Sequence, residues 1–417
     1  MRVLFLHMNF PAQYRHVAQA LSQNSEHQVV FGTNNRDTNL GGIKKVIFGA
    51  NREVNSETHH YLHNLESAVL NGQGAFRMAE KLKSQGFIPD VICGHSGWGP
   101  TLFMKDAFPN AKMLCFFEWY YHAFGTDADF DPDDPLDMNS AAKIRIKNSA
   151  ILLDLAHCDW GLAPTQWQKA QFPQDFHDRM SVLFDGVDTD FFKPEIDAKL
   201  VLPKLDLSHV DEIITYVGRG MEPYRGFPQF MESLPYILER RPNAHVVIVA
   251  SERVCYGKSL PDGKTYKQAM LEKLDLDLSR VHFVGTLPYV EYVKVLKASS
   301  VHIYLTRPFV LSWSMIEAMS TGCLVLGSNT APVAEVIRDG ENGLLFDFFQ
   351  PKQIADRVDE ILDHPTQMAS IRKNARQTVL ENYSLSRLLP KHLQLIYDVA
   401  NGSMARWQSQ NLPFCPL

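Results

Sequence analysis

Two arginines in the second half of the chain, Arg219 and Arg225, have the type and spacing expected of an anion site. They lie in the glycine-flanked segment 218–226, which follows a short apolar and β-branched run at 213–217. A planar guanidinium group donates two parallel hydrogen bonds, and this geometry matches the oxygens of a phosphate. The pair is therefore suited to binding a diphosphate, with surface salt bridges as the alternative.

One glutamate, Glu317, lies about one turn into a predicted helix that follows the polar loop 312–314 and stops at Gly322. Apolar runs at 301–305 and 324–326 flank this helix and predict two buried strands. Strand, loop, helix and strand make a parallel βαβ unit, in which ligands collect at the carboxyl ends of the strands. We expect the carboxylate to face that edge and to accept hydrogen bonds from sugar hydroxyls.

Aromatic and ionisable residues follow two predicted strands in the first half of the chain. The segment Gly94–Gly99 follows the strand expected at 89–93, and Glu118–His122 follows the one expected at 113–117. Aromatic rings stack on sugar faces while polar atoms hold hydroxyl groups, so both segments are suited to a carbohydrate site. Trp98 is expected to form a wall of that site, the alternative being that it packs on the next helix.

The composition is that of an ordinary globular protein. The 417 residues suffice for two domains, and 45% are hydrophobic and 21% charged. The net charge of −6 indicates no nucleic-acid partner. The six cysteines form no CxxC pair, which favours a reducing cytosol. The chain opens on an apolar run too short for a signal peptide, and no run is long enough to span a membrane. We expect a cytoplasmic protein, with contact to the inner face of the membrane left open.

The remaining pattern predicts further elements. A helix is expected from about Gln13 to Leu21, and a long one from Ala142 to Asp159. Thr165 is expected to cap another helix. The loop from Ser251 to Thr265 is unusually long and reads as an insertion. Three helices are expected near the end of the chain, at residues 353–363, 365–382 and 384–399.

The segment 306–346 resembles the donor-binding signature of the family 4 retaining glycosyltransferases, also described as glycosyl transferases group 1. Glu317 and its helix match the second glutamate of the family's two-glutamate pattern, and Glu335 matches an acidic residue in the segment that follows. Phe309 occupies the position of the family's first glutamate. The resemblance continues in the segment 218–226, which is similar to a family loop whose two cations hold the donor phosphates.

The resemblance implies an α/β fold of the GT-B type, with two Rossmann-like, doubly wound domains facing each other across a cleft. Residues 1–192 would form the acceptor-binding domain, and residues 210–383 would form the nucleotide-sugar-binding domain. The segment 193–209 would link them. Residues 384–417 would form a helix that crosses back towards the first domain.

The activity implied by the resemblance is retaining, hexosyltransferase-type transfer from a nucleotide-sugar, a UDP-sugar in preference to a GDP-sugar. The acceptor would be a hydroxyl group of a saccharide, a lipid-linked molecule or a small molecule. No metal or other cofactor is expected. A non-catalytic nucleotide-sugar-binding subunit is the main alternative, because Phe309 breaks the family's pattern. An epimerase or a phosphorylase with the same fold is a further alternative.

The resemblance also implies roles for individual residues. Arg219, Arg225 and the N–H groups of the loop 312–314 would stabilise the departing diphosphate. Glu317 would hold the nucleotide ribose. The other residues expected to contact the donor are Ser312, Trp313, Ser314, Glu335, Gln13 and Val284. For Gln13, whose neighbour Arg15 is an equal candidate, capping of the first helix is the alternative.

Family members place an essential polar residue, often a histidine, at the end of a strand in the first domain. Glu118, His122 and His95 all match that description, and the sequence leaves the choice between them open.

Two further patterns could suggest a metal. His59 and His63 have the spacing of zinc ligands on one helix face, but no third ligand accompanies them, and a solvated helix face is the expected reading. The acidic segment 126–137 could suggest calcium. Its prolines favour a mobile surface loop instead.

Overall fold

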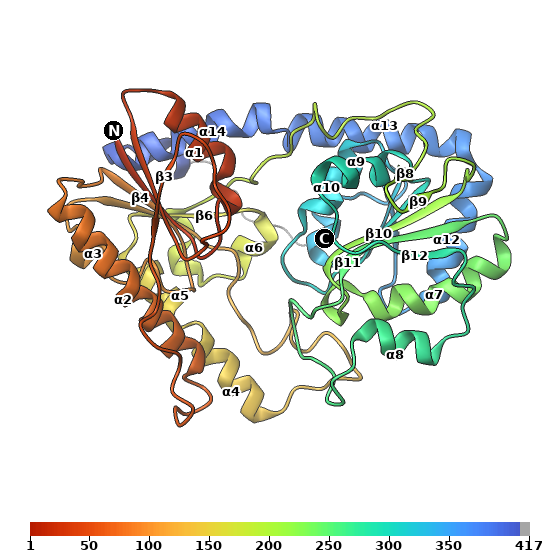
Figure 1. Cartoon of the computed structure of the whole chain (residues 1–417), viewed down its shortest axis with the longest axis horizontal. Coiled ribbons are helices and arrows are strands. Elements are labelled where there is room, and N and C mark those ends of the chain that lie inside the picture. The colour runs from red at the N-terminus through yellow and green to blue at the C-terminus, as the bar shows by residue number, and fades with distance from the viewer. Residues whose placement is uncertain (409–417) are drawn as a thin grey trace. The chain divides into compact units, whose positions relative to one another are not determined.

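The computed structural model describes residues 1–408 of the chain. Contacts divide these residues into two compact units. Unit 1 contains Met1–Asp185 together with the chain from Leu388 onwards, and unit 2 contains Gly186–Arg387. Each unit is built around its own parallel sheet with helices on both faces (Figure 1).

The sheet of unit 1 has seven strands in the order β3-β2-β1-β4-β5-β6-β7, all paired in parallel. Its strands are β1 (Arg2–Leu6), β2 (Gln28–Thr33), β3 (Lys44–Ile47), β4 (Val91–His95), β5 (Lys112–Phe116), β6 (Trp160–Ala163) and β7 (Met180–Val182). The helices of unit 1 are η1 (Ala12–Tyr14), α1 (Arg15–Gln23), α2 (His63–Ser84), α3 (Met104–Ala107), α4 (Met138–Lys147), α5 (Ser149–His157), α6 (Gln166–Ala170), η2 (Gln174–Arg179), α14 (Leu385–Asn401, which begins in unit 2) and α15 (Ala405–Gln408).

Alternation along β1 explains the two helix layers of unit 1. Leu4 and Leu6 belong to a buried cluster that includes residues of α2, α3 and α5. Phe5 points to the other face, where its ring lies 5.1 Å from that of Tyr14, next to α1. Because successive side chains of a strand point to opposite faces, a fully apolar strand needs cover on both sides. The apolar run at the start of the chain therefore specifies a central strand.

The sheet of unit 2 has six parallel strands in the order β12-β11-β10-β13-β14-β15. Its strands are β10 (Ile213–Gly220), β11 (His245–Ser251), β12 (Val281–Phe283), β13 (Val301–Tyr304), β14 (Val325–Ser328) and β15 (Leu344–Phe346). The helices are η3 (Pro223–Arg225), α7 (Phe227–Arg240), α8 (Tyr266–Lys273), α9 (Tyr289–Lys297), α10 (Trp313–Ser320), α11 (Ala331–Ala334), α12 (Pro351–Asp363) and α13 (Pro365–Asn382). Figure 1 shows α7 and α8 on one side of this sheet and α9, α10 and α13 on the other.

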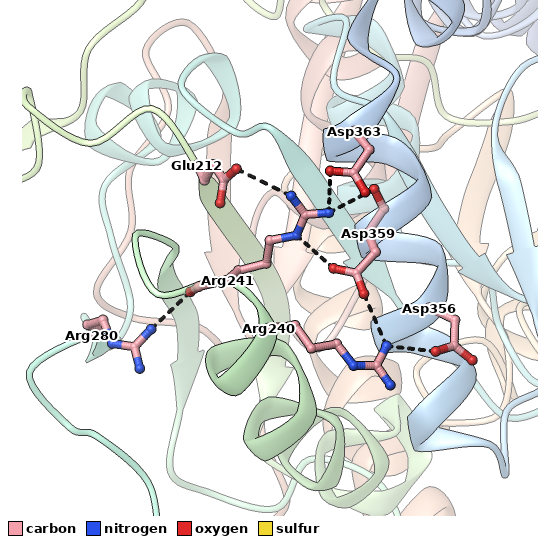
Figure 2. Close-up of polar contacts among 7 residues, drawn as sticks. All are labelled: Glu212, Arg240, Arg241, Arg280, Asp356, Asp359 and Asp363. Carbon is pink, nitrogen blue, oxygen red and sulfur yellow. Dashed lines mark hydrogen bonds and ion pairs between the residues drawn. The ribbon is translucent and has the colours of Figure 1, made fainter.

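The amino edge of the unit 2 sheet carries a network of ion pairs (Figure 2). Arg241, at the end of α7, contacts Asp359 and Asp363 of α12 at 2.7 Å each. Arg240 contacts Asp356 at 2.7 Å, also on α12. The network joins α7 to α12 at the edge opposite the carboxyl ends of the strands. Its role is therefore in packing, and it lies away from the edge at which ligands are expected.

Several predicted elements are confirmed, with small shifts at their ends. The two buried strands around Glu317 are β13 and β14, and the helix between them is α10. The three helices expected near the end of the chain are α12, α13 and α14. The Thr165 side chain caps α6 by accepting a hydrogen bond from the Gln168 N–H. Among the described residues, no helix is both long enough and apolar enough to cross a membrane.

Other expectations differ from the structure. The long helix expected at 142–159 is two helices, α4 and α5, which meet at Asn148. The Asn148 side chain exchanges two hydrogen bonds with the backbone of Tyr121, of 2.9 and 2.8 Å. This tertiary contact fixes the break. The first helix begins as the 3-10 turn η1, and α1 starts at Arg15 rather than Gln13.

The boundaries of the units also differ from those expected. The segment Gly186–Phe192 belongs to unit 2, where Arg376 donates hydrogen bonds to the carbonyls of Thr189 and Phe192. The expected linker 193–209 contains a two-stranded hairpin, β8 (Val201–Leu202) and β9 (Leu205–Asp206). These hydrogen bonds attach the segment to unit 2. The boundary between the units therefore lies before Gly186, earlier in the chain than expected.

Residues 388–408 pack within unit 1. The His392 ring bonds to the carbonyl of Phe184 at 2.9 Å, and the Tyr397 hydroxyl lies 2.8 Å from the His27 ring. Figure 1 shows α14 beside α1. Part of the expected final segment, 384–417, lies outside the described residues, which end at 408.

Candidate functional site

The carboxyl edge of the unit 1 sheet contains a pocket with a volume of about 280 Å³. Four segments line it: the start of α2, the turn after β4, the turn after β5, and the junction of α4 and α5. Both segments expected to form a carbohydrate site therefore contribute residues to one cavity, whereas Tyr120 and His122 do not line it. Trp98 lines this pocket with 53% of its surface exposed, and its role as a stacking surface for a sugar stays a prediction.

Two of the three competing polar residues lie together in this pocket. His95 is buried, and its Nδ1 donates a hydrogen bond to the Ser96 carbonyl at 2.8 Å. That bond leaves Nε2 facing the pocket, 3.6 Å from Oε2 of Glu118. The Glu118 side chain is 34% exposed. A hydroxyl group entering the pocket would thus meet an imidazole nitrogen and a carboxylate side by side.

His122, the third competitor, points elsewhere. Its Nε2 donates a hydrogen bond to the Gln171 carbonyl at 2.7 Å, next to α6. Its ring lies 5.4 Å from the ring of Tyr120 and does not line the pocket. The structure therefore separates His122 from His95 and Glu118.

A buried aspartate that the sequence analysis missed holds the turn after β4. Asp154 of α5 accepts hydrogen bonds from the hydroxyls of Ser96 (2.7 Å) and Thr101 (2.8 Å) and from the Gly97 N–H (3.4 Å), all on Oδ2. Oδ1 is buried without a hydrogen-bond partner among the described residues. Burial raises the pKa of Asp154 to about 6, against the effect of these bonds. The sequence did offer a signal for this residue, because Asp154 is the one ionisable residue in the apolar stretch Ile151–Leu155.

The turn after β4 also depends on a glycine. Gly99 has a φ of +105°, and a Cβ there would lie 1.9 Å from the Ala68 carbonyl oxygen of α2. Only glycine fits this approach. The expected tight turn therefore brings Trp98 against the start of α2, where Asn71 donates a hydrogen bond to the Trp98 carbonyl at 3.3 Å.

The two arginines of unit 2 lie at the carboxyl end of β10 but differ in exposure. Arg219 is exposed, whereas Arg225 is 6% exposed. Nη1 of Arg225 donates to Thr306 Oγ1 and to the Val310 carbonyl, both at 2.8 Å. Its guanidinium group also lies over the Tyr256 ring, at 5.4 Å. Arg225 is thus a buried cation joined to the loop after β13, and it is not part of a surface salt bridge.

The long loop after β11 is anchored to the arginine loop. Glu222, between the two arginines, is completely buried. Its Oε2 accepts hydrogen bonds from the N–H groups of Cys255 and Tyr256 in that loop. Burial raises the pKa of Glu222, while these backbone bonds and the charges of Arg225 and Arg219 act in the opposite direction. The inserted loop is therefore held against the predicted phosphate site.

Phe309, at the position of the family's first glutamate, belongs to an aromatic cluster. Its ring centroid lies 5.3 Å from that of Tyr224 and 5.2 Å from that of Tyr256. Phe309 is 6% exposed. Aromatic rings thus pack edge to face where the family has a carboxylate. The long loop after β11 supplies one of these rings, that of Tyr256.

Glu317 is the buried acceptor of unit 2. It is 6% exposed, and its carboxylate accepts hydrogen bonds from the hydroxyls of Tyr292 (2.9 Å) and Tyr289 (3.4 Å). Burial raises the pKa of Glu317 to about 7, although both bonds lower it. Tyr289 is 47% exposed, so its longer bond lies where an incoming hydroxyl group could replace it.

The start of α10 has the geometry expected of an anion-facing helix end. The Ser312 side chain caps the helix by accepting from the Ser314 N–H, and its own N–H donates to Tyr304 Oη at 2.9 Å. Trp313 is 39% exposed. The capping bond is long, at 3.4 Å, so the Ser314 N–H is held weakly.

The three remaining donor candidates lie on separate elements. Gln13 lies in η1 of unit 1, where its side chain caps neither η1 nor α1, and its Oε1 is buried without a partner among the described residues. The Val284 N–H is bonded to the Ile248 carbonyl at 3.1 Å, so a nucleotide base could reach only its carbonyl. Glu335 ends α11 near Tyr383, and its charge adds to the burial that raises the pKa of that phenol.

The segments that could suggest a metal are arranged differently from expectation. His59 and His63 do not share a helix, because α2 begins at His63, whose Nε2 donates to the Thr58 carbonyl. The acidic segment 126–137 is not a surface loop throughout. Asp127 is 3% exposed, and Asp137 caps α4 by accepting from the Ser140 N–H.

Comparisons with known proteins cover both units. Residues 25–192 match the "Glycosyl transferase family 4 group" model, and residues 200–378 match "Glycosyl transferases group 1". Spore coat protein SA of Bacillus subtilis (strain 168) is 23% identical over 81% of this chain and 84% of its own length. D-inositol 3-phosphate glycosyltransferase of Corynebacterium glutamicum (strain R) is 26% identical over 45% of this chain and 44% of its own. That second match thus spans less than half of either protein.

Solved structures show the same fold. HepE of Anabaena in complex with UDP-glucose has a TM-score of 0.68 at 14% identity, covering 96% of this chain and 100% of that one. Sucrose-phosphate synthase from Thermosynechococcus elongatus has a TM-score of 0.70 at 17% identity, covering 97% and 100%. Both are GT-B glycosyltransferases, and the two parallel sheets of this chain match two Rossmann-like domains. The chain therefore belongs to the group 1 glycosyltransferases of family 4 and is a glycosyltransferase with the GT-B fold.

Proposed function

We propose that this enzyme transfers a sugar, with retention of configuration, from a UDP-sugar to a hydroxyl group of a saccharide, lipid-linked or small-molecule acceptor. The observation that carries the proposal is the position of Glu317, a buried carboxylate on the helix after β13. The loop that leads into this helix accepts a hydrogen bond from the buried Arg225. Solved structures of HepE with UDP and with UDP-glucose favour UDP over GDP as the nucleotide.

Glu317 is suited to hold the ribose. A carboxylate can accept from two vicinal hydroxyl groups at once, and the Glu317 carboxylate already accepts from two phenols. The bond from Tyr289 is the longer one and its donor is exposed, so one ribose hydroxyl replaces it at small cost. Tyr292 remains as the second donor and keeps the carboxylate oriented.

The diphosphate is proposed to lie against Arg219, Arg225 and the first N–H groups of α10. Among the described residues, Arg225 donates its side-chain hydrogen bonds through Nη1. Its Nη2 can therefore donate to a phosphate oxygen. Helix N–H groups and guanidinium groups stabilise the charge that develops on the departing diphosphate. In a retaining reaction of this class, that phosphate helps to deprotonate the acceptor.

The acceptor is proposed to bind in the unit 1 pocket. His95 and Glu118 would orient the attacking hydroxyl group, and the exposed face of Trp98 would stack on the sugar ring. With two arginines available to balance the phosphates, no divalent metal is required. Turnover should therefore be unchanged in EDTA, and a loss that magnesium or manganese restores would contradict this part of the proposal.

The test of the whole proposal is nucleotide release. Pure protein incubated with a panel of UDP-, GDP- and ADP-sugars, with and without simple sugars, should release UDP from at least one UDP-sugar. Binding of UDP by calorimetry without any release would favour a non-catalytic nucleotide-sugar-binding subunit. The anomeric configuration of a product, read by NMR, tests retention.

We further propose that the enzyme works in the cytoplasm. The five cysteines of the described residues are all free thiols, and four of them are buried. Free buried thiols are typical of a reducing compartment. Fractionation of cells that express the chain tests this, and co-sedimentation with anionic lipid vesicles tests contact with the inner face of the membrane.

A further inference from the structure

One basic side chain lines the unit 1 pocket. Of the lysines and arginines in the described residues, only Lys147, the last residue of α4, borders this cavity. Its Nζ lies 3.6 Å from the centroid of the Tyr121 ring, which also lines the pocket. The proposed roles of His95, Glu118 and Trp98 make no use of this cation.

No carboxylate lies within ion-pair distance of Lys147 among the described residues. Glu118, the acidic residue of the pocket, is next to His95 instead. Asp127 acts on Lys147 only over a longer distance, and Lys143, one turn earlier on α4, repels it. Burial is the main reason that the pKa of Lys147 falls to about 8. The group is still mostly charged at neutral pH, because that pH lies below its pKa.

The position of Lys147 is fixed by its neighbours. Asn148 holds the backbone of Tyr121 through the two hydrogen bonds that separate α4 from α5. The ring beneath the ammonium group is therefore anchored. An ammonium group that has lost water and has no counter-ion is costly, and an anion bound beside it would offset that cost. A phenol ring offsets only part of it.

The rest of the pocket fits a polyol. Asn64, Ser67 and Asn71 contribute amide and hydroxyl groups from one face of α2, and Trp98 contributes an exposed ring. We propose that this pocket binds an acceptor sugar that carries an anionic group, a carboxylate or a phosphate, and that Lys147 contacts that group. The inference rests on the proposed function, in which this pocket is the acceptor site.

The test compares charged and neutral sugars on the full-length protein. Binding of glucuronate, glucose 6-phosphate, glucose and inorganic phosphate is measured by ligand-observed NMR. The variants are Lys147→Met, which keeps the length and removes the charge, and Lys147→Arg, which keeps the charge. Lys143→Met is the matched control, because Lys143 is an exposed residue of the same helix that does not line the pocket.

Wild-type protein should bind at least one anionic sugar about tenfold or more tighter than glucose, the scale of one charge-assisted hydrogen bond. Lys147→Met should remove that preference while leaving glucose binding unchanged, and Lys147→Arg and Lys143→Met should keep it. Glucuronate, glucose 6-phosphate and inorganic phosphate together identify which anion is recognised. An equal affinity for charged and neutral sugars in the wild type, a preference that survives in Lys147→Met, or no binding of any probe would each overturn the inference.

A pH series separates a binding cation from a structural one. The preference for glucuronate should decline as pH rises above about 8, the pKa of Lys147, while glucose binding stays constant. The charged and titratable groups that face this lysine are Asp127, Lys143, Tyr121 and Glu118. Preference that is constant up to pH 10 would contradict the role of Lys147. Failure of the proposed function is seen separately, as absence of UDP release from every UDP-sugar whatever these sugars bind.

Discussion

The carboxyl edges of the two sheets hold their polar side chains in different ways. In unit 1, His95 and Glu118 face a pocket, and the buried group that supports them, Asp154, lies behind the turn. In unit 2, Arg225 and Glu317 are themselves buried and already bonded to protein groups. One edge presents its reactive groups to a cavity, and the other keeps them paired until a ligand competes.

The difference shows how each edge limits the free-energy cost of burying polar side chains away from water. Pairing Arg225 and Glu317 with hydroxyl groups and a carbonyl satisfies them in the free protein, so they also contribute to stability. In unit 1, the Glu118 side chain is partly exposed, and Nε2 of the buried His95 faces the cavity. Changes at Arg225 and Glu317 should therefore alter both stability and nucleotide binding, whereas changes at His95 and Glu118 should alter turnover alone.

The largest effect is expected at Glu317. Glu317→Ala should cost roughly 2–4 kcal/mol of UDP affinity through two lost charge-assisted bonds, while alanine remains compatible with the helix. Because burial raises its pKa to about 7, wild-type UDP affinity should fall as pH drops below 7 and the carboxylate takes a proton. Calorimetry at several pH values measures both. A variant with wild-type affinity and a lowered Tm would show that Glu317 has only a structural role.

Arg225→Ala and Arg219→Ala sharpen the comparison within unit 2. Each should weaken UDP binding by about 1.5–3 kcal/mol, the scale of a charge-assisted hydrogen bond. Only Arg225→Ala should also lower Tm, because it leaves Thr306 and the Val310 carbonyl without their donor. Thermal melts and calorimetry on the same samples check this. Unchanged affinity in both variants, with the fold intact, would exclude these arginines from the phosphate site.

Substitutions in the unit 1 pocket should reduce turnover without weakening the binding of the donor. Glu118→Gln and His95→Asn should reduce kcat by about a hundredfold, the lower end of the range for groups that help proton transfer. UDP affinity and Tm should stay near the wild-type values. His122→Asn is the matched control, since its ring bonds to Gln171 outside the pocket. Equal loss in the control and in His95→Asn would break the distinction drawn between the two histidines.

At Asp154 the expected effect is on stability. Asp154→Ala removes the acceptor of three hydrogen bonds and should cost about 1–3 kcal/mol, whereas Asp154→Asn keeps an acceptor oxygen for them. The folded pKa is raised to about 6, so the wild type loses stability as pH rises from its unfolded pKa through 6. Denaturant titrations at pH 4.5 and 8 should show this loss in the wild type and not in Asp154→Asn. An identical pH dependence in both would contradict the assignment.

Most of the fold follows from patterns that act locally. Apolar runs such as 3–6 and 301–305 specify central strands because both faces of a parallel sheet are buried. Glycine-flanked and polar segments after those runs predict where binding residues gather. His95 and Glu118 do lie at such strand ends, and Glu317 lies on α10, the helix that follows the loop after β13. The family membership rests on the same segments and on the comparisons with relatives.

The tertiary structure alone decided which of these residues share a site. Sequence spacing leaves His95 and His122 equivalent, but the bond from His122 to Gln171 turns that ring away, and no local pattern encodes the position of α6. Lys147 and Asp154 lie on elements that reach the pocket only by packing, so neither was predicted from the sequence. The sequence determines where strands end, because periodicity is a property of neighbours along the chain. Which side chains meet depends on rotamers and helix packing, which are set by residues far apart in it.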